Sequence, residues 1–186
     1  MRGRLLRVRR VVLPDTVHSF PLEDPPRVGE RLFVRFEGAA PGGAGVVADV
    51  AELRRTGVGA VLTVAARRRA EPVFERDGVV EFEAVEVGSP ADRARRDEAV
   101  AALRAYLGAL AEFGEGADVL VEVPDDPVAA SYRLTSLARV SEPERQELLD
   151  QPATAERLGR IAGLFERERR LLVATMGARG RHGGHR

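Results

Sequence analysis

Three closely spaced helix-start signals, all in the second half of the chain, constrain the fold more than any other feature. Asp126 can cap a first helix with its carboxylate. Ser141 and Glu144 fit the capping box S-x-x-E of a second helix, and Thr154 can cap a third and longer one. Helices this short are not stable alone, so they must pack on one another or on another part of the chain.

The first half of the chain favours β-strands. Short apolar segments are separated by turns, of which Asp77-Gly78 is the strongest hairpin signal. The expected strands are residues 4–13, 31–36, 46–53, 58–66, 72–75 and 79–87, with an extended segment at 12–22. The alternation of apolar residues changes phase at Ala84-Val85, which predicts a β-bulge there. Short strands joined by hairpins favour a small antiparallel barrel.

A change of period marks the boundary between the two halves. Ser89 and Pro90 can start a helix that runs to about Phe113. The sequence therefore predicts an α+β fold in which residues 1–88 form the barrel subdomain. Residues 89–177 would form a helical bundle that ends in a long helix, and residues 178–186, rich in Gly, Arg and His, are expected to be disordered.

Composition excludes several classes of function. The formal net charge of the 186 residues is zero, so no global charge attracts the chain to nucleic acid or to an anionic membrane. There is no cysteine, which excludes disulfides and thiol chemistry. No apolar run approaches the roughly 20 residues of a membrane span, and the basic N-terminus lacks the apolar core of a signal peptide. We therefore expect a cytoplasmic protein.

An ordered series of motifs also carries a family resemblance. The order is DDP…SY, then S-x-x-E-[RK]-Q-x-LL, then T-A-E-RL, then a long charged helix. The residues are Asp125, Asp126, Pro127, Ser131, Tyr132, Ser141, Glu142, Glu144, Gln146, Leu148, Leu149, Thr154, Ala155, Glu156, Arg157 and Leu158. This series resembles the second half of the Lon protease amino-terminal domain, or Lon substrate-binding domain, in its stand-alone form. In the first half, Gly45–Leu53 resembles a strand of that family, whereas Glu23–Pro26 stands where the family has a helix start.

The resemblance implies a PUA-like barrel followed by a helical bundle, and a protein that binds polypeptide without a cofactor. Complete Lon proteases use a lysine in their Ser–Lys dyad and another in their phosphate loop, and this chain contains no lysine. We therefore expect neither protease nor ATPase activity. The implied partners are unfolded or flexible polypeptides and a separate Lon-type protease, for which the protein would be an adaptor or substrate-recognition module.

Polypeptide binding needs exposed apolar surface, and the sequence offers it in two places. One is the extended segment that contains Val17, Phe20 and Leu22, and the other is the first long helix near Tyr106 and Phe113. Phe20 either contacts the ligand, where an aromatic ring gives a large contact area, or fills the barrel.

Five arginines define an alternative function. Arg54, Arg55, Arg67, Arg68 and Arg69 would form a basic patch if the hairpin brought them together. Because PUA-like barrels bind RNA in other families, an RNA-binding module is the alternative to polypeptide binding. The other interpretation of these arginines is a solvated strand face.

The sequence predicts no catalytic residue and no metal site. His18 lies beside Ser19 in a proline-flanked segment, and His182 and His185 lie in the glycine-rich tail with no third ligand nearby. Capping accounts for Asp126 of the acidic pair, and a solvated turn accounts for Asp125.

Overall fold

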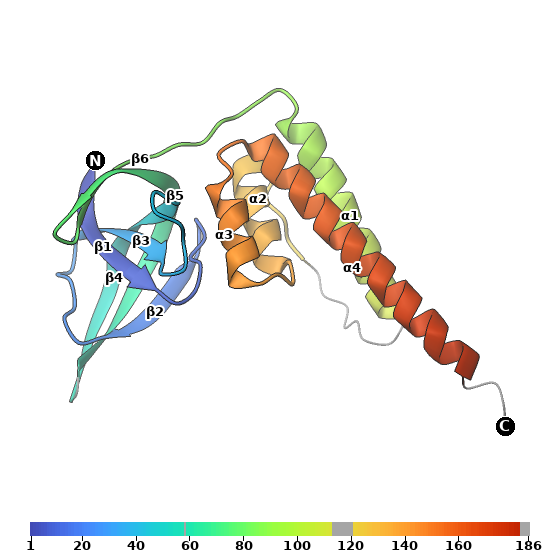
Figure 1. Ribbon diagram of the computed structural model, residues 1–186, viewed down its shortest axis with the longest axis horizontal. Coiled ribbons are helices and arrows are strands. Elements are labelled where there is room, and N and C mark those ends of the chain that lie inside the picture. The colour runs from blue at the N-terminus through green and yellow to red at the C-terminus, as the bar shows by residue number, and fades with distance from the viewer. Residues whose placement is uncertain (58, 113–120, 183–186) are drawn as a thin grey trace. The chain divides into compact units, whose positions relative to one another are not determined.

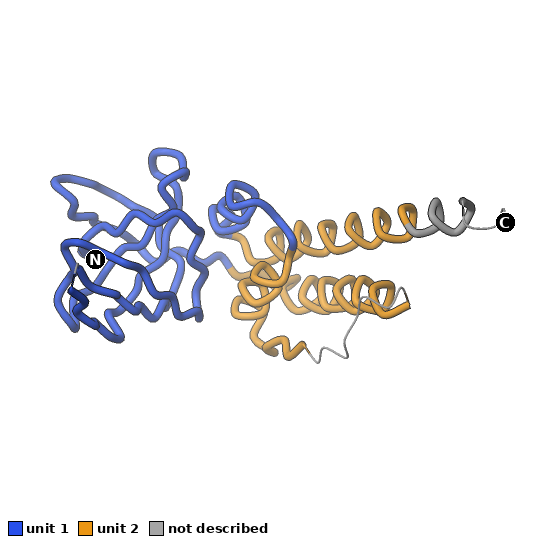
Figure 2. The backbone as a smooth tube through the Cα atoms, turned by 90° about the horizontal axis from the view of Figure 1, so that it is seen from below, with its two compact units in different colours: residues 1–87, 139–152 blue, residues 88–138, 153–186 orange. Residues whose placement is uncertain are grey.

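The structure is a computed structural model that describes residues 1–57, 59–112 and 121–182. The chain divides into two compact units (Figure 2). The first comprises residues 1–87 and 139–152, and the second comprises residues 88–138 and 153–186. The first unit therefore includes a segment, 139–152, that the sequence predicts to lie in the helical subdomain.

The first unit is built on a six-stranded sheet (Figure 1). Its strands are β1 (Arg2–Val8), β2 (Val17–Leu22), β3 (Arg31–Phe36), β4 (Gly45–Thr56), β5 (Gly59–Arg76) and β6 (Val79–Glu83). The strand order is β2-β5-β4-β3-β1-β6, and β6 also pairs with β5. The pairing therefore runs from β5 through β4, β3, β1 and β6 back to β5, with β2 attached to the side of β5.

The sheet is mixed, which corrects the expectation of a wholly antiparallel one. β1 and β3 pair in parallel, from Arg4 opposite Leu32 to Val8 opposite Phe36. A parallel pair needs a long crossover, and the connection between these two strands supplies it by passing through β2.

The sequence predicts two strands in this region, but β5 is one continuous strand. It is long because it pairs with two other strands, β4 and β6. Its first part pairs with β4, and Glu71–Arg76 pairs with β6. The predicted turn between β5 and β6 is confirmed, since Asp77 and Gly78 both have positive φ angles, 51° and 76°. The bulge predicted at Ala84-Val85 is wrong: β6 ends at Glu83, and the irregularities lie elsewhere in the sheet.

Tight aromatic packing fills the interior of the first unit. The rings of Phe33 and Phe82 stack with centroids 5.4 Å apart, and Val47, Ala70 and Val80 surround them. The backbone passes close to this cluster at Gly45, where an added Cβ would lie 2.5 Å from the Val34 carbonyl oxygen.

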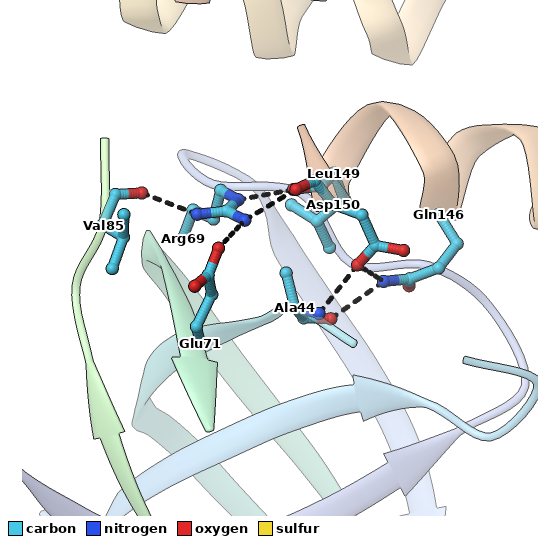
Figure 3. A network of polar contacts seen from close by, with 7 residues as sticks. All are labelled: Ala44, Arg69, Glu71, Val85, Gln146, Leu149 and Asp150. Carbon is cyan, nitrogen blue, oxygen red and sulfur yellow. Dashed lines mark hydrogen bonds and ion pairs between the residues drawn. The ribbon is translucent and has the colours of Figure 1, made fainter. Parts of the chain in front are cut away.

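Helix α3 (Glu142–Asp150) is hydrogen-bonded at both ends to segments that connect the strands of the first unit. The predicted capping box of Ser141 and Glu144 is present at its start. There the Glu142 carboxylate also accepts a hydrogen bond of 2.5 Å from the backbone N–H of Val11. At its end, the Asp150 carboxylate accepts a 2.7 Å bond from the N–H of Ala44 (Figure 3).

The second unit contains α1 (Asp92–Glu112), α2 (Pro127–Leu137) and α4 (Thr154–His182). Helices α1 and α4 lie side by side and run in the same direction (Figures 1 and 2). Asp126 caps α2 by accepting from the N–H of Ala129, as predicted. Because α4 continues to His182, part of the tail predicted to be disordered is helical. Residues 183–186, including His185, lie outside the described residues.

Candidate functional site

An open cleft of about 610 Å³ lies in the first unit, between β2 and the end of β1. Its volume falls within the range of protein ligand sites, roughly 300–1,000 Å³. Residues 7–10 line one side and residues 18–22 line the other, with Glu37 directly after β3. The cleft therefore contains two of the predicted binding residues, Phe20 and Leu22.

The strand register explains why these two side chains are only half buried. Phe20 lies opposite Leu62 and Leu22 lies opposite Ala60 on β5, and both of these β5 residues are buried. Phe20 and Leu22 therefore point to the inner face of the sheet, like their partners. They remain partly exposed because, among the described residues, β2 pairs with a strand on its β5 side only.

Val17, the third predicted residue of this segment, does not line the cleft. It stands three positions before Phe20, so the alternation of side chains places it on the opposite face of β2. There it is 68% exposed.

Tyr106 does not lie on the exposed apolar surface that the sequence predicts for it. Tyr106 is only 7% exposed, and its ring stacks on Phe165 of α4 with centroids 6.1 Å apart. Helical spacing puts it on the same buried stripe of α1 as Leu103. Tyr106 is thus part of the interior of the second unit, and Phe113 lies outside the described residues.

The five arginines do not form the predicted basic patch. Arg54 and Arg55 lie near the tip of the β4–β5 hairpin, opposite Val61 and Ala60. Arg67 lies six residues further along β5 than Val61, which is about 20 Å at the usual rise of a strand. Arg67 and Arg68 are exposed, and the guanidinium of Arg67 is paired with Asp49 at 2.9 Å.

Arg69 is fully buried and has a structural role (Figure 3). Its guanidinium donates to the carbonyl oxygens of Leu149, Asp150 and Val85, at 2.5, 2.8 and 2.7 Å. It also forms an ion pair with Glu71 at 2.5 Å. Since all of these groups belong to the first unit, Arg69 links its sheet to the end of α3.

Sequence reasoning missed the arginines on the β1 side of the cleft, Arg7, Arg9 and Arg10. Their interleaving with apolar residues indicates only a basic outer face. In the structure, the guanidinium of Arg7 forms an ion pair with the Glu75 carboxylate at 2.8 Å, and the guanidinium of Arg9 lies 3.8 Å from the Glu37 carboxylate. Arg10 has no carboxylate partner within the described part of the chain, so this side of the cleft is positively charged.

His18, which lines the cleft, is uncharged at neutral pH. Burial lowers its pKa below the usual 6.5, and the nearby Arg10 lowers it further, against an opposing effect of Glu142. The Thr16 hydroxyl donates its hydrogen to the Leu13 carbonyl oxygen, so the 2.9 Å contact with Thr16 makes His18 Nε2 the donor. The imidazole is therefore neutral with its hydrogen on Nε2.

His18 and Ser19 do not form a catalytic pair. Their side chains lie on opposite faces of β2, and the Ser19 hydroxyl bonds instead to Thr63 at 2.9 Å. Asp125, from the acidic pair, is paired with Arg96 at 2.9 Å.

The described residues contain no group of three or more histidine, cysteine, aspartate or glutamate side chains placed to hold a metal ion. Within the same ranges, no helix is both long enough and apolar enough to cross a membrane.

The sheet, the helices and the cleft together define an α+β protein with an open groove beside an edge strand. The N-terminal domain of the Lon protease of the Mycobacterium avium complex has a similar structure. The TM-score is 0.67 at 19% identity, over 89% of this chain and 98% of that one. A Lon N-terminal domain protein from Xanthomonas campestris is also similar, with a TM-score of 0.57 at 17% identity over 88% and 98%.

The chain therefore has the fold of a Lon amino-terminal domain, which confirms at the level of the fold the resemblance seen in the motifs. No family model matches the sequence, and no curated protein matches it.

Proposed function

We propose that this protein binds unfolded or flexible polypeptide, without catalysing a reaction, through the cleft between β2 and the end of β1. The observation that carries the proposal is the partial exposure of Phe20 and Leu22 on the inner face of an edge strand, where they line the cleft. An aromatic ring held in such a place offers a large contact area at a small cost in conformational entropy.

The fold supports a link with ATP-dependent proteolysis. Both similar structures are N-terminal domains of Lon proteins, and the resemblance in the motifs points to the substrate-binding role of that domain. The return of strand pairing from β6 to β5 supports a small PUA-like barrel. On this basis the protein acts as an adaptor or substrate-recognition module, alone or with a separate Lon-type protease.

A non-enzymatic role agrees with the chemistry of the chain. It contains no lysine, which the dyad and the phosphate loop of complete Lon proteases both need. The His18 imidazole is bonded to Thr16, and the Ser19 hydroxyl is bonded to Thr63. Purified protein is therefore expected to hydrolyse neither ATP nor peptide.

The test is a titration with a fluorescently labelled protein that reduction and alkylation keep permanently unfolded. Fluorescence anisotropy should report binding of this form, and no binding of the same protein with its disulfides intact. A labelled single-stranded RNA serves as the comparison ligand. Binding of the RNA alone, weakening steeply as salt is raised, would overturn polypeptide binding in favour of nucleic-acid binding.

A further inference from the structure

We infer that the cleft binds an extended acidic segment of polypeptide, which adds as a new strand to the free edge of β2. The inference rests on the proposed function and specifies both the geometry and the charge of the ligand. Three features of the first unit carry it: the outward backbone groups of β2, the opening beside that strand, and the arginines across the cleft.

One backbone hydrogen bond fixes which groups of β2 point outward. The N–H of Ala66 donates to the carbonyl oxygen of Thr16 at 2.9 Å, so Thr16 is in a hydrogen-bonded position opposite β5. Antiparallel pairs alternate between bonded and non-bonded positions. Phe20 and its alternate neighbours on β2 therefore bond to β5, whereas Val17, Ser19 and Pro21 direct their backbone groups to the open edge.

These outward groups are available for a partner. Among the described residues, no hydrogen bond is made to the backbone of Val17, Ser19 or Pro21 on that edge. Pro21 agrees with this orientation, because proline has no N–H and is tolerated on the solvent side of an edge strand. The edge thus offers two N–H donors, from Val17 and Ser19, and three carbonyl acceptors.

The space beside this edge suits an added strand. β6 covers only Arg2–Arg4 of β1, and the following end of β1 lines the far side of the cleft. An extended segment between β2 and that end would bond to the backbone at Ser19 and place every second side chain on the inner face. Those side chains would cover Phe20 and Leu22, which the sheet leaves partly exposed.

Charge selects the kind of segment. The lining of the cleft contains three arginines. Arg7 is paired with Glu75 and Arg9 lies 3.8 Å from Glu37, so among the described residues Arg10 carries the positive charge without a carboxylate partner, while His18 is neutral. Complementary charge favours a ligand whose outward side chains are acidic. A segment in which apolar residues alternate with aspartate or glutamate meets both requirements.

The first experiment uses the unaltered protein and a labelled peptide of alternating leucine and glutamate. Amide hydrogen exchange, followed by NMR, should show fast exchange at Val17 and Ser19 in the free protein and strong protection of both in the complex. The amide of Phe20 should be protected in both states, because it already bonds to β5. This alternation is expected for strand addition and not for contact through side chains alone.

The second experiment compares Ser19→Pro with Ser19→Ala. Both lose the hydroxyl that bonds to Thr63, but only the proline variant loses the outward N–H. We expect Ser19→Pro to bind the peptide about tenfold more weakly than Ser19→Ala, the effect of one backbone hydrogen bond in a complex. A peptide with lysine in place of glutamate should bind more weakly to the unaltered protein than the acidic one does.

The outcomes separate this inference from the proposed function. If the unfolded protein binds but Val17 and Ser19 stay unprotected in the peptide complex, strand addition is wrong and polypeptide binding stands. The same conclusion follows if the acidic peptide does not bind while the unfolded protein does. If neither ligand binds, the proposed function fails as well. Should Ser19→Pro fail to fold, the exchange pattern of the unaltered protein decides.

Discussion

The guanidinium of Arg69 on β5 donates a 2.5 Å hydrogen bond to the carbonyl oxygen of Leu149, 80 residues further along the chain. Leu149 lies in the last turn of α3, where carbonyl groups have no partner within the helix and the helix dipole is negative. The buried guanidinium of Arg69 donates hydrogen bonds to these carbonyl groups, and its positive charge interacts favourably with the negative end of the helix dipole. This contact explains why α3 belongs to the same compact unit as the sheet.

Replacing Arg69 by methionine should destabilise the first unit strongly. The change leaves the carbonyl oxygens of Leu149, Asp150 and Val85 without their donor, in a site where Arg69 is fully buried. We expect the free energy of unfolding to fall by about 3 kcal/mol, measured by urea denaturation followed by circular dichroism. Arg67→Met is the matched control on the same strand and should change it by less than about 0.5 kcal/mol. Equal effects of the two substitutions would contradict this role of Arg69.

The sequence does not predict that Arg67 is exposed whereas Arg69 is buried. Ala48 pairs with Ala66 and Val47 pairs with Arg68, so no residue of β4 lies opposite Arg67 in the strand register. This irregularity shifts the alternation and turns Arg69 inward. Three consecutive arginines do not indicate this irregularity, because it depends on the register between β4 and β5.

Features fixed by local chemistry were predicted correctly. The capping box at Ser141, the N-cap at Asp126 and the turn at Asp77-Gly78 each depend on a few neighbouring residues. The position of Tyr106 depends on α4, which is distant in sequence, and its burial was missed. Within the cleft, the sequence indicated Phe20 and Leu22 but not the arginines opposite them. It is the fold that brings the end of β1 beside β2.

Two glycines should respond in opposite ways to substitution by alanine. At Gly45 the new Cβ would lie 2.5 Å from the Val34 carbonyl oxygen and 2.8 Å from the Phe33 ring, both in the tightly packed interior. Gly45→Ala should therefore cost about 1–3 kcal/mol or more. Gly108, in α1, has nothing within 4 Å of its added Cβ, so Gly108→Ala should stabilise the helix by about 0.5–1 kcal/mol. Urea denaturation of both variants checks the signs, and stabilisation by Gly45→Ala would refute the close approach.

Acidification should reduce stability partly through His18. Its pKa lies below the usual 6.5 in the folded protein, through burial and the charge of Arg10, so the unfolded chain binds the proton more tightly. This contribution to stability is fully present above pH 6.5 and is lost as the pH falls toward the lowered pKa. His18→Gln keeps a donor for Thr16 but does not titrate. The variant should therefore lose less stability than the unaltered protein between about pH 7 and pH 5.

Arg10→Gln provides the control for the pH dependence. Removing the nearby positive charge should raise the pKa of His18 toward its usual value and so reduce the loss on acidification. The measurement is the urea denaturation midpoint as a function of pH for the three proteins. Parallel curves for the unaltered protein, His18→Gln and Arg10→Gln would show that His18 does not contribute to the pH dependence of stability.

The most direct test of binding at the cleft compares Phe20→Ala with Phe74→Ala. Both remove a phenyl ring from a strand of the first unit, but Phe20 lines the cleft, whereas Phe74 is 55% exposed outside it, on β5. The measurement is the affinity of each folded variant for the permanently unfolded test protein. We predict at least tenfold weaker binding for Phe20→Ala, since an anchoring aromatic residue commonly contributes 2 kcal/mol or more, and unchanged binding for Phe74→Ala. Unchanged binding by folded Phe20→Ala, with weakened binding by Phe74→Ala, would contradict the assignment of the cleft.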